Sequence, residues 1–209
     1  MNINELNTKL VEIKGKPHLT KTRKQQMLKA YRDYCTNYTE LIIFKEESAE
    51  LLQCISKYKR GRLEIKHLSI KEEIADVAIC IDQLAYLFHI EPDMIHDPDN
   101  VHGIDLHLPE STLAVLHTIE YILIHMMEFI DTIDFRCNIE REEIKEVIYQ
   151  PYKVGMNSYE FEFIITARQL LKCIDKLVAL AGINPETIEY IKDIKLLRAE
   201  DRRMNDEPM

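Results

Sequence analysis

Glycine and proline are scarce in this sequence, tryptophan is absent, and no long hydrophobic run occurs. Only 5 Gly and 7 Pro stand among 209 residues, whereas 46% of the residues are apolar and 30% are charged. Few tight turns are therefore available, and most of the chain is free to form helices. No stretch approaches 18 uninterrupted apolar residues, and the first residues, MNINELNTKLVEIKGK, lack the apolar segment of a secretion signal. We expect an all-α, cytoplasmic protein that does not bind a membrane.

Paired cysteines and an excess of positive charge are also missing. The five cysteines lie far apart, without CxxC spacing and mostly inside apolar runs, so we expect reduced thiols in the core. The net charge is -9, which is unsuited to proteins that bind nucleic acid by neutralising its phosphates with Lys and Arg. An acidic protein can still bind phosphates when divalent cations neutralise them.

Apolar residues recur at helical spacing in two early segments, 39–60 and 68–90, which flank the polar stretch KYKRGRLEIKHLS. This pattern predicts a helical hairpin. In the second segment, one continuous apolar stripe indicates the buried face: Ile70, Ile74, Val77, Ile81, Leu84 and Phe88. Further helices are predicted over these ranges: 21–37, 110–134, 139–149, 158–181 and 185–204.

The two halves of the chain resemble each other. With an offset of 93 residues, CIDQLAYLFHIEPDMI aligns without a gap with CIDKLVALAGINPETI, and eight of the sixteen positions are identical. Pro92 and Pro185 are both predicted in the first turn of a new helix, where the missing N–H does no harm. We interpret the pattern as a duplication in one helical bundle, with halves at 1–96 and 110–209 and a linker at 97–109. The alternative is chance similarity between two amphipathic helices.

Two pairs of carboxylates occur in the predicted hairpin. Glu47 and Glu50 are three residues apart in KEESAELLQ, and Glu73 and Asp76 are three residues apart in KEEIADVAI, so each pair shares one face of its helix. The first pair interrupts an otherwise apolar line and is expected to face inward. Inward charges must be paired or bound to a metal ion, because an isolated buried charge is costly. The alternative is a solvated acidic face that pairs with nearby lysines.

Spacing alone does not select these four among 36 acidic residues. One competing group is Glu128, Asp131 and Asp134, and another lies in IEREEIKE at 139–146. The linker also carries histidines and aspartates that could bind a transition metal, although such residues are ordinary in a polar loop.

The sequence around the four carboxylates resembles the all-α nucleoside triphosphate pyrophosphohydrolases, a superfamily that includes MazG-like enzymes, dimeric dUTPases and dCTP pyrophosphatases. EESAELLQCISKYKRG and EEIADVAICIDQLAYLF are similar to the family's EExxE and ExxD motifs, which fall here on Glu46, Glu47, Glu50, Glu73 and Asp76. The resemblance covers residues 38–95. It implies cleavage of an NTP or dNTP to the monophosphate and pyrophosphate, with Mg²⁺, or Mn²⁺ in its place, held by the last four of these acids.

The same resemblance implies further roles. Glu47 or Glu50 would act as the general base that deprotonates the attacking water. The closing basic helix would contact phosphates through Lys195 and Arg198. A basic run between the first two helices would also reach the outer phosphates, or else is a solvated hairpin loop; it comprises Lys57, Lys59, Arg60 and Arg62.

The repeat limits the number of sites. With the offset of 93 residues, Glu73 aligns with Thr166 and Asp76 aligns with Gln169, so the second half is a degenerate copy and we expect one metal site per chain. Asp82 keeps an aspartate as its counterpart in that half, which favours a structural role for this residue.

Other functions within and outside this superfamily stay open. The substrate could be restricted to dUTP or dCTP, and the chain could instead be a catalytically idle helical bundle that binds nucleotides or a partner protein. A homodimer is expected, because the bundles of this superfamily generally assemble across subunits.

Overall fold

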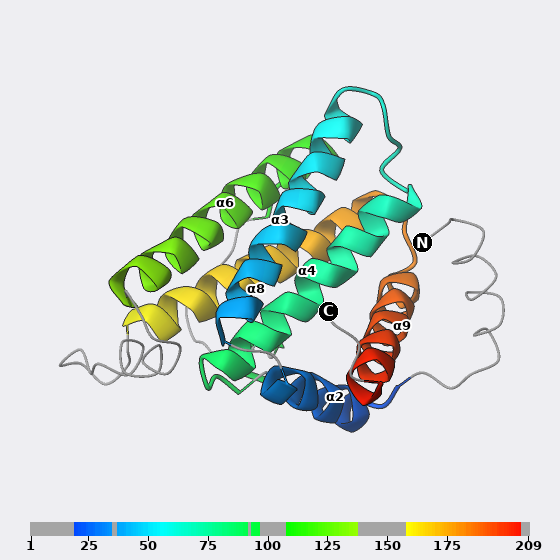
Figure 1. Ribbon diagram of the computed structural model, residues 1–209. Coiled ribbons are helices and arrows are strands. Elements are labelled where there is room, and N and C mark those ends of the chain that lie inside the picture. Colours follow the sequence, from blue (N-terminus) through cyan, green and yellow to red (C-terminus); the bar gives the residue numbers. More distant parts are fainter. Residues whose placement is uncertain (1–18, 35–36, 92, 97–107, 138–157, 206–209) are drawn as a thin grey trace.

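The computed structural model describes residues 19–34, 37–91, 93–96, 108–137 and 158–205, and these residues form helices without strands (Figure 1). The predicted all-α class is therefore confirmed. The helices, in chain order, are α2 (Lys21–Tyr34), α3 (Asn37–Lys59), α4 (Leu68–Leu87), α5 (Asp93–His96), α6 (Thr112–Cys137), α8 (Ser158–Leu180) and α9 (Pro185–Met204).

Four long helices surround the main core. α3 and α4 form the predicted hairpin, α6 packs against α3, and α8 packs against both α6 and α4. The stripe on α4 that was predicted to face the core is buried along its whole length, from Ile70 to Phe88. Phe88 also packs edge-to-face on Phe163 of α8, with ring centroids 4.9 Å apart. This core fixes the α3–α4 hairpin in place.

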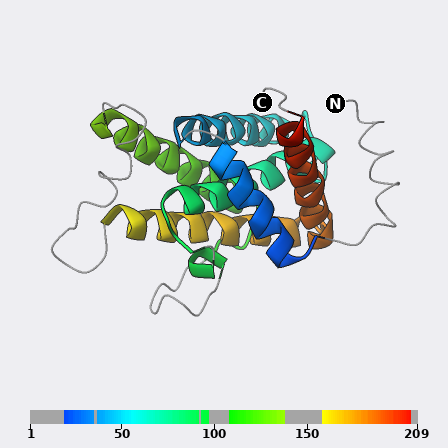
Figure 2. The ribbon, with the colours of Figure 1, turned by 60° about the horizontal axis from the view of Figure 1, so that its bottom comes forward.

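α2 and α9 lie together against α4, at one side of the four-helix core (Figures 1 and 2). A second apolar cluster joins them, in which Leu28 of α2 and Leu196 of α9 meet Ile79 of α4. Ion pairs then link α2 to α9, including Arg23 with Glu200 at 2.7 Å. These contacts determine which face of α9 is turned toward α4.

The C-terminal ends of α4 and α8 have the same backbone geometry at the predicted offset of 93 residues. His89 has φ 56° and Gly182 has φ 59°. One residue later, the N–H groups of Ile90 and Ile183 each donate to the carbonyl five residues earlier, at 2.8 and 3.0 Å. This is the hydrogen-bond pattern of a helix closed by a left-handed residue. The likeness supports the repeat over this turn.

Other predictions about the chain's organisation have mixed outcomes. Pro185 is the first residue of α9, after the N-cap Asn184, as predicted. Pro92, the linker residues 97–107 and the helix predicted at 139–149 lie outside the described residues, and the division into two halves stays a prediction. Buried, unpaired thiols are found for three cysteines, as expected: Cys54, Cys80 and Cys173.

α6 is the most apolar of the described helices. By length and composition alone, its segment Thr112–Thr132 could cross a membrane, yet 44% of the most apolar part is buried inside the bundle. Its exposed side carries Tyr121 and Ile124, while Leu116 and Leu123 lie in the core. This two-sided pattern is the one expected of a bundle helix.

Candidate metal centre

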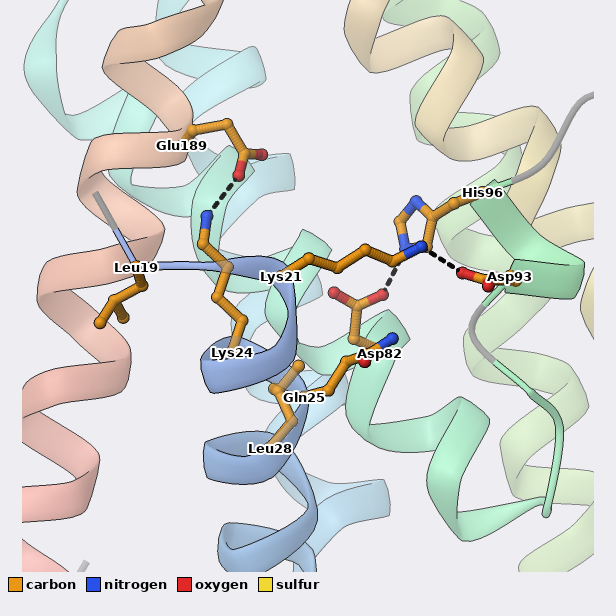
Figure 3. Close-up of a pocket in the computed structure, with 9 residues that line it drawn as sticks. All are labelled: Leu19, Lys21, Lys24, Gln25, Leu28, Asp82, Asp93, His96 and Glu189. Atoms are coloured by element: carbon orange, nitrogen blue, oxygen red, sulfur yellow. Dashed lines mark hydrogen bonds and ion pairs between the residues drawn. The ribbon is translucent and has the colours of Figure 1, made fainter. Parts of the chain in front are cut away.

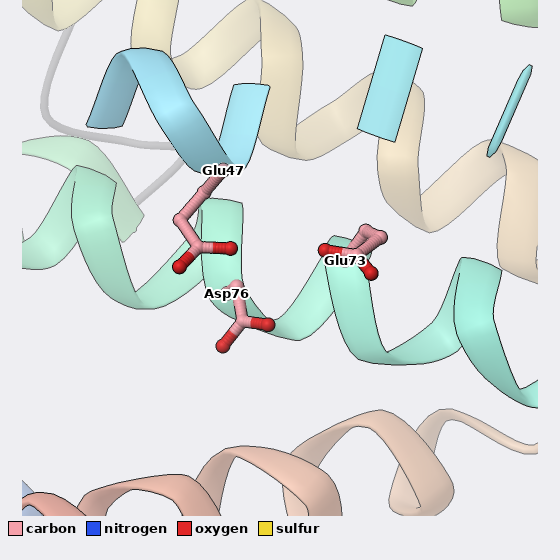
Figure 4. A group of neighbouring side chains, drawn as sticks. All are labelled: Glu47, Glu73 and Asp76. Atoms are coloured by element: carbon pink, nitrogen blue, oxygen red, sulfur yellow. The ribbon is translucent and has the colours of Figure 1, made fainter. Parts of the chain in front are cut away.

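Three carboxylates meet between α3 and α4. Glu47 projects from α3, and Glu73 and Asp76 project from α4, with one oxygen of each within 4.8 Å of the others (Figure 4). All three residues are half-buried. The arrangement follows from the hairpin, since the two helices run alongside each other and Glu73 and Asp76 are one helical turn apart. These three residues belong to the set of four carboxylates that the sequence singled out, and their role as metal ligands stays a prediction.

One carboxylate oxygen in this group lacks a hydrogen-bond partner. Within the described part of the chain, Oε2 of Glu73 is buried and accepts no hydrogen bond. Leaving a buried acceptor unsatisfied costs about 1–3 kcal/mol, and more when the group is charged. Carboxylate oxygens are the ligands that Mg²⁺ and Mn²⁺ prefer, so the donor set fits a divalent cation of this kind.

Burial and the crowding of negative charge raise the pKa values of the three acids. Burial, together with the charge of Asp76, raises the pKa of Glu47 to about 7 and that of Glu73 to about 8. Burial also raises the pKa of Asp76, although Lys195 opposes this shift. Without a cation these groups tend to hold protons near neutral pH, and a bound divalent cation would favour the ionised forms.

A cationic side chain from the end of the chain completes this region. Lys195 of α9 forms an ion pair with Asp76. Lys195 was predicted to bind phosphate and Asp76 to bind the metal ion, so the two predicted residues lie side by side. Two of the three carboxylates, Glu47 and Asp76, line a pocket of about 340 Å³ between α3, α4 and α9. Its lining includes Lys195 and Arg198, both predicted, and also Gln83 and Arg202, which the sequence analysis did not single out.

Glu50 differs from the prediction. It was expected to face inward beside Glu47, but it is exposed, and its oxygens are not part of the close group formed by the other three acids. Residues three apart on a helix are displaced by about 60° around the axis, which here turns Glu50 toward solvent. Its charge nevertheless raises the pKa of Glu47 and Glu73, so it lies near them. Its role as a ligand stays a prediction.

The basic run at the C-terminal end of α3 and just beyond it is not part of the pocket lining described above. Lys59 forms an ion pair with Glu120 of α6, and its Nζ lies 3.0 Å from Nδ1 of His117. Lys57 donates to the side chain of Gln53 at 2.6 Å. Lys59 therefore ties α3 to α6. Phosphate contacts by Lys57, Lys59, Arg60 and Arg62 stay predictions.

Asp82 lies in a second pocket, between α2, α4, α5 and α9 (Figure 3). Its Oδ1 is 2.6 Å from Nε2 of His96, which joins α4 to α5. In the same pocket Lys21 forms an ion pair with Asp93 at 2.6 Å. Asp82 is not one of the clustered carboxylates. These contacts suit the structural role predicted for it.

The competing acidic residues form no comparable group among the residues described. Asp131 pairs with Lys45, and Glu128 is exposed, while the side chain of Asp134 and residues 139–146 lie outside the described part. In the second half, Thr166 occupies the position equivalent to Glu73 and donates its hydroxyl to the carbonyl of Glu162 at 2.6 Å.

Comparisons with protein-family models, with curated proteins and with solved structures gave no match. The site must therefore supply the argument for function. It combines three converging carboxylates, an unsatisfied buried oxygen and a pocket that is also lined by the cationic side chains of Lys195, Arg198 and Arg202.

Proposed function

We propose that this chain is a magnesium-dependent nucleoside triphosphate pyrophosphohydrolase, which converts an NTP or dNTP to the monophosphate and pyrophosphate. The observation that carries the proposal is the close group formed by Glu47, Glu73 and Asp76 beside Lys195. Four negative charges on a triphosphate require cations, and an acidic site can bind it only through metal ions and through lysine or arginine.

Glu47, Glu73 and Asp76 would hold Mg²⁺, with Mn²⁺ as the alternative ion. When bound, the ion supplies charge neutralisation on the phosphates and lowers the pKa of water. Lys195 is positioned to bind a phosphate oxygen once Asp76 turns to the cation, because its ammonium already lies at the edge of the group. Arg198, which lines the same pocket, would contact a second phosphate.

Glu50 is the better placed of the two predicted general bases. It lies close enough for its charge to act on Glu47 and Glu73, yet it is exposed and outside the close group of oxygens. A base must reach the proton of the attacking water without being occupied as a ligand. We therefore assign proton abstraction to Glu50 and metal binding to Glu47.

The experiment is a panel of NTPs and dNTPs incubated with the purified chain and Mg²⁺, followed by assays for pyrophosphate and the monophosphate. Glu73→Gln should lower turnover by at least about a hundredfold. Loss of a residue that only hydrogen-bonds to a metal ligand already lowers metal affinity or activity about ten- to a hundredfold, and loss of a ligand should cost more. Glu128→Gln, a charge-matched change at an exposed residue of α6, should keep it. Release of orthophosphate would contradict the proposed bond of cleavage, and no turnover of any nucleotide would contradict the enzyme.

The same panel separates a broad enzyme from one restricted to dUTP or dCTP. Homodimer formation and a cytoplasmic location remain part of the proposal, and light scattering of the purified chain tests the first.

A further inference from the structure

Gln83 of α4 is a buried polar residue that lines the pocket beside the carboxylates. Only 4% of its surface is exposed. Its carboxamide is not one of the fully buried polar groups that lack a partner among the described residues, so the reason to consider Gln83 is its place on the pocket wall. A carboxamide there can pair with a ligand through one donor group and one acceptor group.

Gln83 and the carboxylates lie at different ends of the pocket. Gln83 follows Asp76 by seven residues, which places it two turns further along the same face of α4, about 10 Å along the axis. Apolar side chains also line the pocket, among them Ile43 of α3, Ile79 of α4 and Leu196 of α9. A nucleotide has the same division, with charged phosphates at one end and a flat, largely apolar base with polar edges at the other.

The donors available at the second end favour one class of base edge. A carboxamide offers N–H and C=O groups side by side, and it can pair with two adjacent groups on a base. By rotation it suits either a keto oxygen next to a ring N–H or an amino group next to a ring nitrogen. Arg202, which lines the same pocket, can only donate hydrogen bonds. It therefore favours the edge that carries the keto oxygen.

We propose that Gln83 binds the base of the nucleotide in the orientation that Arg202 favours, and that the two residues together select bases with a keto oxygen next to a ring N–H, which are uracil, thymine, guanine and hypoxanthine, over cytosine and adenine. This inference rests on the proposed function, because it takes a nucleotide as the ligand. It names the substrate class of the same site and adds a specificity-determining residue.

Two substrate pairs test the selection, because each pair differs only at this edge: UTP with CTP, and ITP with ATP. Binding of their α,β-methylene analogues, which resist hydrolysis at the bond in question, is measured by calorimetry with Mg²⁺. The wild type should prefer the keto member by about ten- to a hundredfold, the discrimination of a bidentate contact to a base edge. Gln83→Met, of similar shape but without the amide, should remove the preference.

Two further variants keep the test sharp. Gln83→Glu has only acceptors, so it should shift the preference toward CTP and ATP, whose amino groups donate. This reversal is an outcome that loss of folding cannot produce. Gln25→Met, the same exchange in the other pocket, should keep the wild-type preference.

The outcomes separate this inference from the proposed function. Equal affinity of the wild type for both members of each pair, or a preference that survives in Gln83→Met, would overturn the role of Gln83, while pyrophosphate release would leave the enzyme standing. Preferential binding without hydrolysis of any nucleotide would support Gln83 and contradict the enzyme. If no analogue binds, both proposals fail.

Discussion

Lys195 of α9 and Asp76 of α4 form an ion pair across 119 residues of sequence, and both side chains are largely buried. This pair links the last helix to the carboxylate group. It neutralises Asp76, whereas Glu47 and Glu73 have no ion pair of this kind among the described residues.

Lys195→Met should destabilise the metal-free protein by about 2 kcal/mol, because it leaves a buried, hydrogen-bonded charge unpaired. In Asp76→Asn the same lysine exchange should cost clearly less, since the two residues act as one unit. Urea unfolding in EDTA measures both values. Lys176→Met, which breaks the exposed pair with Glu110, serves as the comparison and should cost less than about 1 kcal/mol. Strictly additive effects at Lys195 and Asp76 would argue against this pairing.

The metal-free protein should lose stability as the pH rises from 4.5 to about 8. Burial and neighbouring charges raise the pKa of Glu47 to about 7 and that of Glu73 to about 8, from the ordinary value of 4.5. Between these values the folded state binds more protons than the unfolded state, so the contribution of these groups is complete below 4.5 and disappears above 8.

Thermal unfolding in EDTA across this pH range checks the prediction. Glu73→Gln should show a shallower decline than the wild type, because a neutral amide no longer titrates. Saturating Mg²⁺ should raise the Tm most at high pH, where all three acids are ionised. A Tm that rises with pH by the same amount in both proteins would show that these acids are not perturbed in this direction.

Glu73→Gln should mainly weaken Mg²⁺ binding, whereas Glu50→Gln should mainly lower kcat. Loss of Glu73 should weaken Mg²⁺ binding by at least about a hundredfold, as expected for a ligand. Loss of Glu50 should leave Mg²⁺ affinity within about threefold and lower kcat by about 100- to 10,000-fold, which is the usual contribution of a general base. Calorimetric Mg²⁺ titration and steady-state kinetics separate the two. If both variants lose the metal alike, Glu50 is a ligand after all.

Asp82→Ala should reduce stability by about 1–3 kcal/mol, because it removes a partner of His96 and leaves the junction of α4 and α5 without this contact. Its Mg²⁺ affinity should equal that of the wild type. Urea unfolding and the same Mg²⁺ titration test these expectations together. Normal stability combined with lost Mg²⁺ binding would instead place Asp82 among the ligands.

His89→Gly should relieve the backbone strain of a non-glycine residue at φ 56°, although it also removes an interaction that His89 makes. Gly182→Ala, at the aligned position 93 residues later, should destabilise the protein by about 1 kcal/mol. Its added Cβ would meet only Lys66, whose Nζ lies at an ordinary 3.5 Å and whose Cε lies at 4.0 Å, so the backbone conformation decides the outcome. Tm values of both variants provide the check.

Much of the fold follows from local patterns in the sequence. The stripe from Ile70 to Phe88 identified the buried face of α4, because 3.6-residue periodicity is a property of the helix itself. Glu73 and Asp76 lie beside that stripe, so their orientation followed from it. Glu47 was predicted with them because it interrupts the apolar line of its own helix and matches the EExxE motif, and the predicted hairpin brings that helix alongside α4.

The remaining features depend on packing between distant segments. A rotation of α3 by part of a turn decides whether Glu50 or Glu47 faces the pocket, and periodicity does not resolve angles of about 60°. Lys59 was assigned to phosphates because nothing in the sequence indicated that Glu120 would lie beside it. Gln83 lines a pocket only because α9 packs beside α4, and no local pattern predicts that packing.

The order of these elements along the chain has a consequence for folding. α3 and α4 are consecutive, so their contacts are local and are expected to form early. Such a hairpin brings Glu47, Glu73 and Asp76 together before the neutralising Lys195, 119 residues after Asp76, has arrived. Electrostatic repulsion then opposes assembly of the hairpin until α9 docks. A divalent cation present during refolding would substitute for the late lysine, so we expect Mg²⁺ to accelerate folding as well as to stabilise its product.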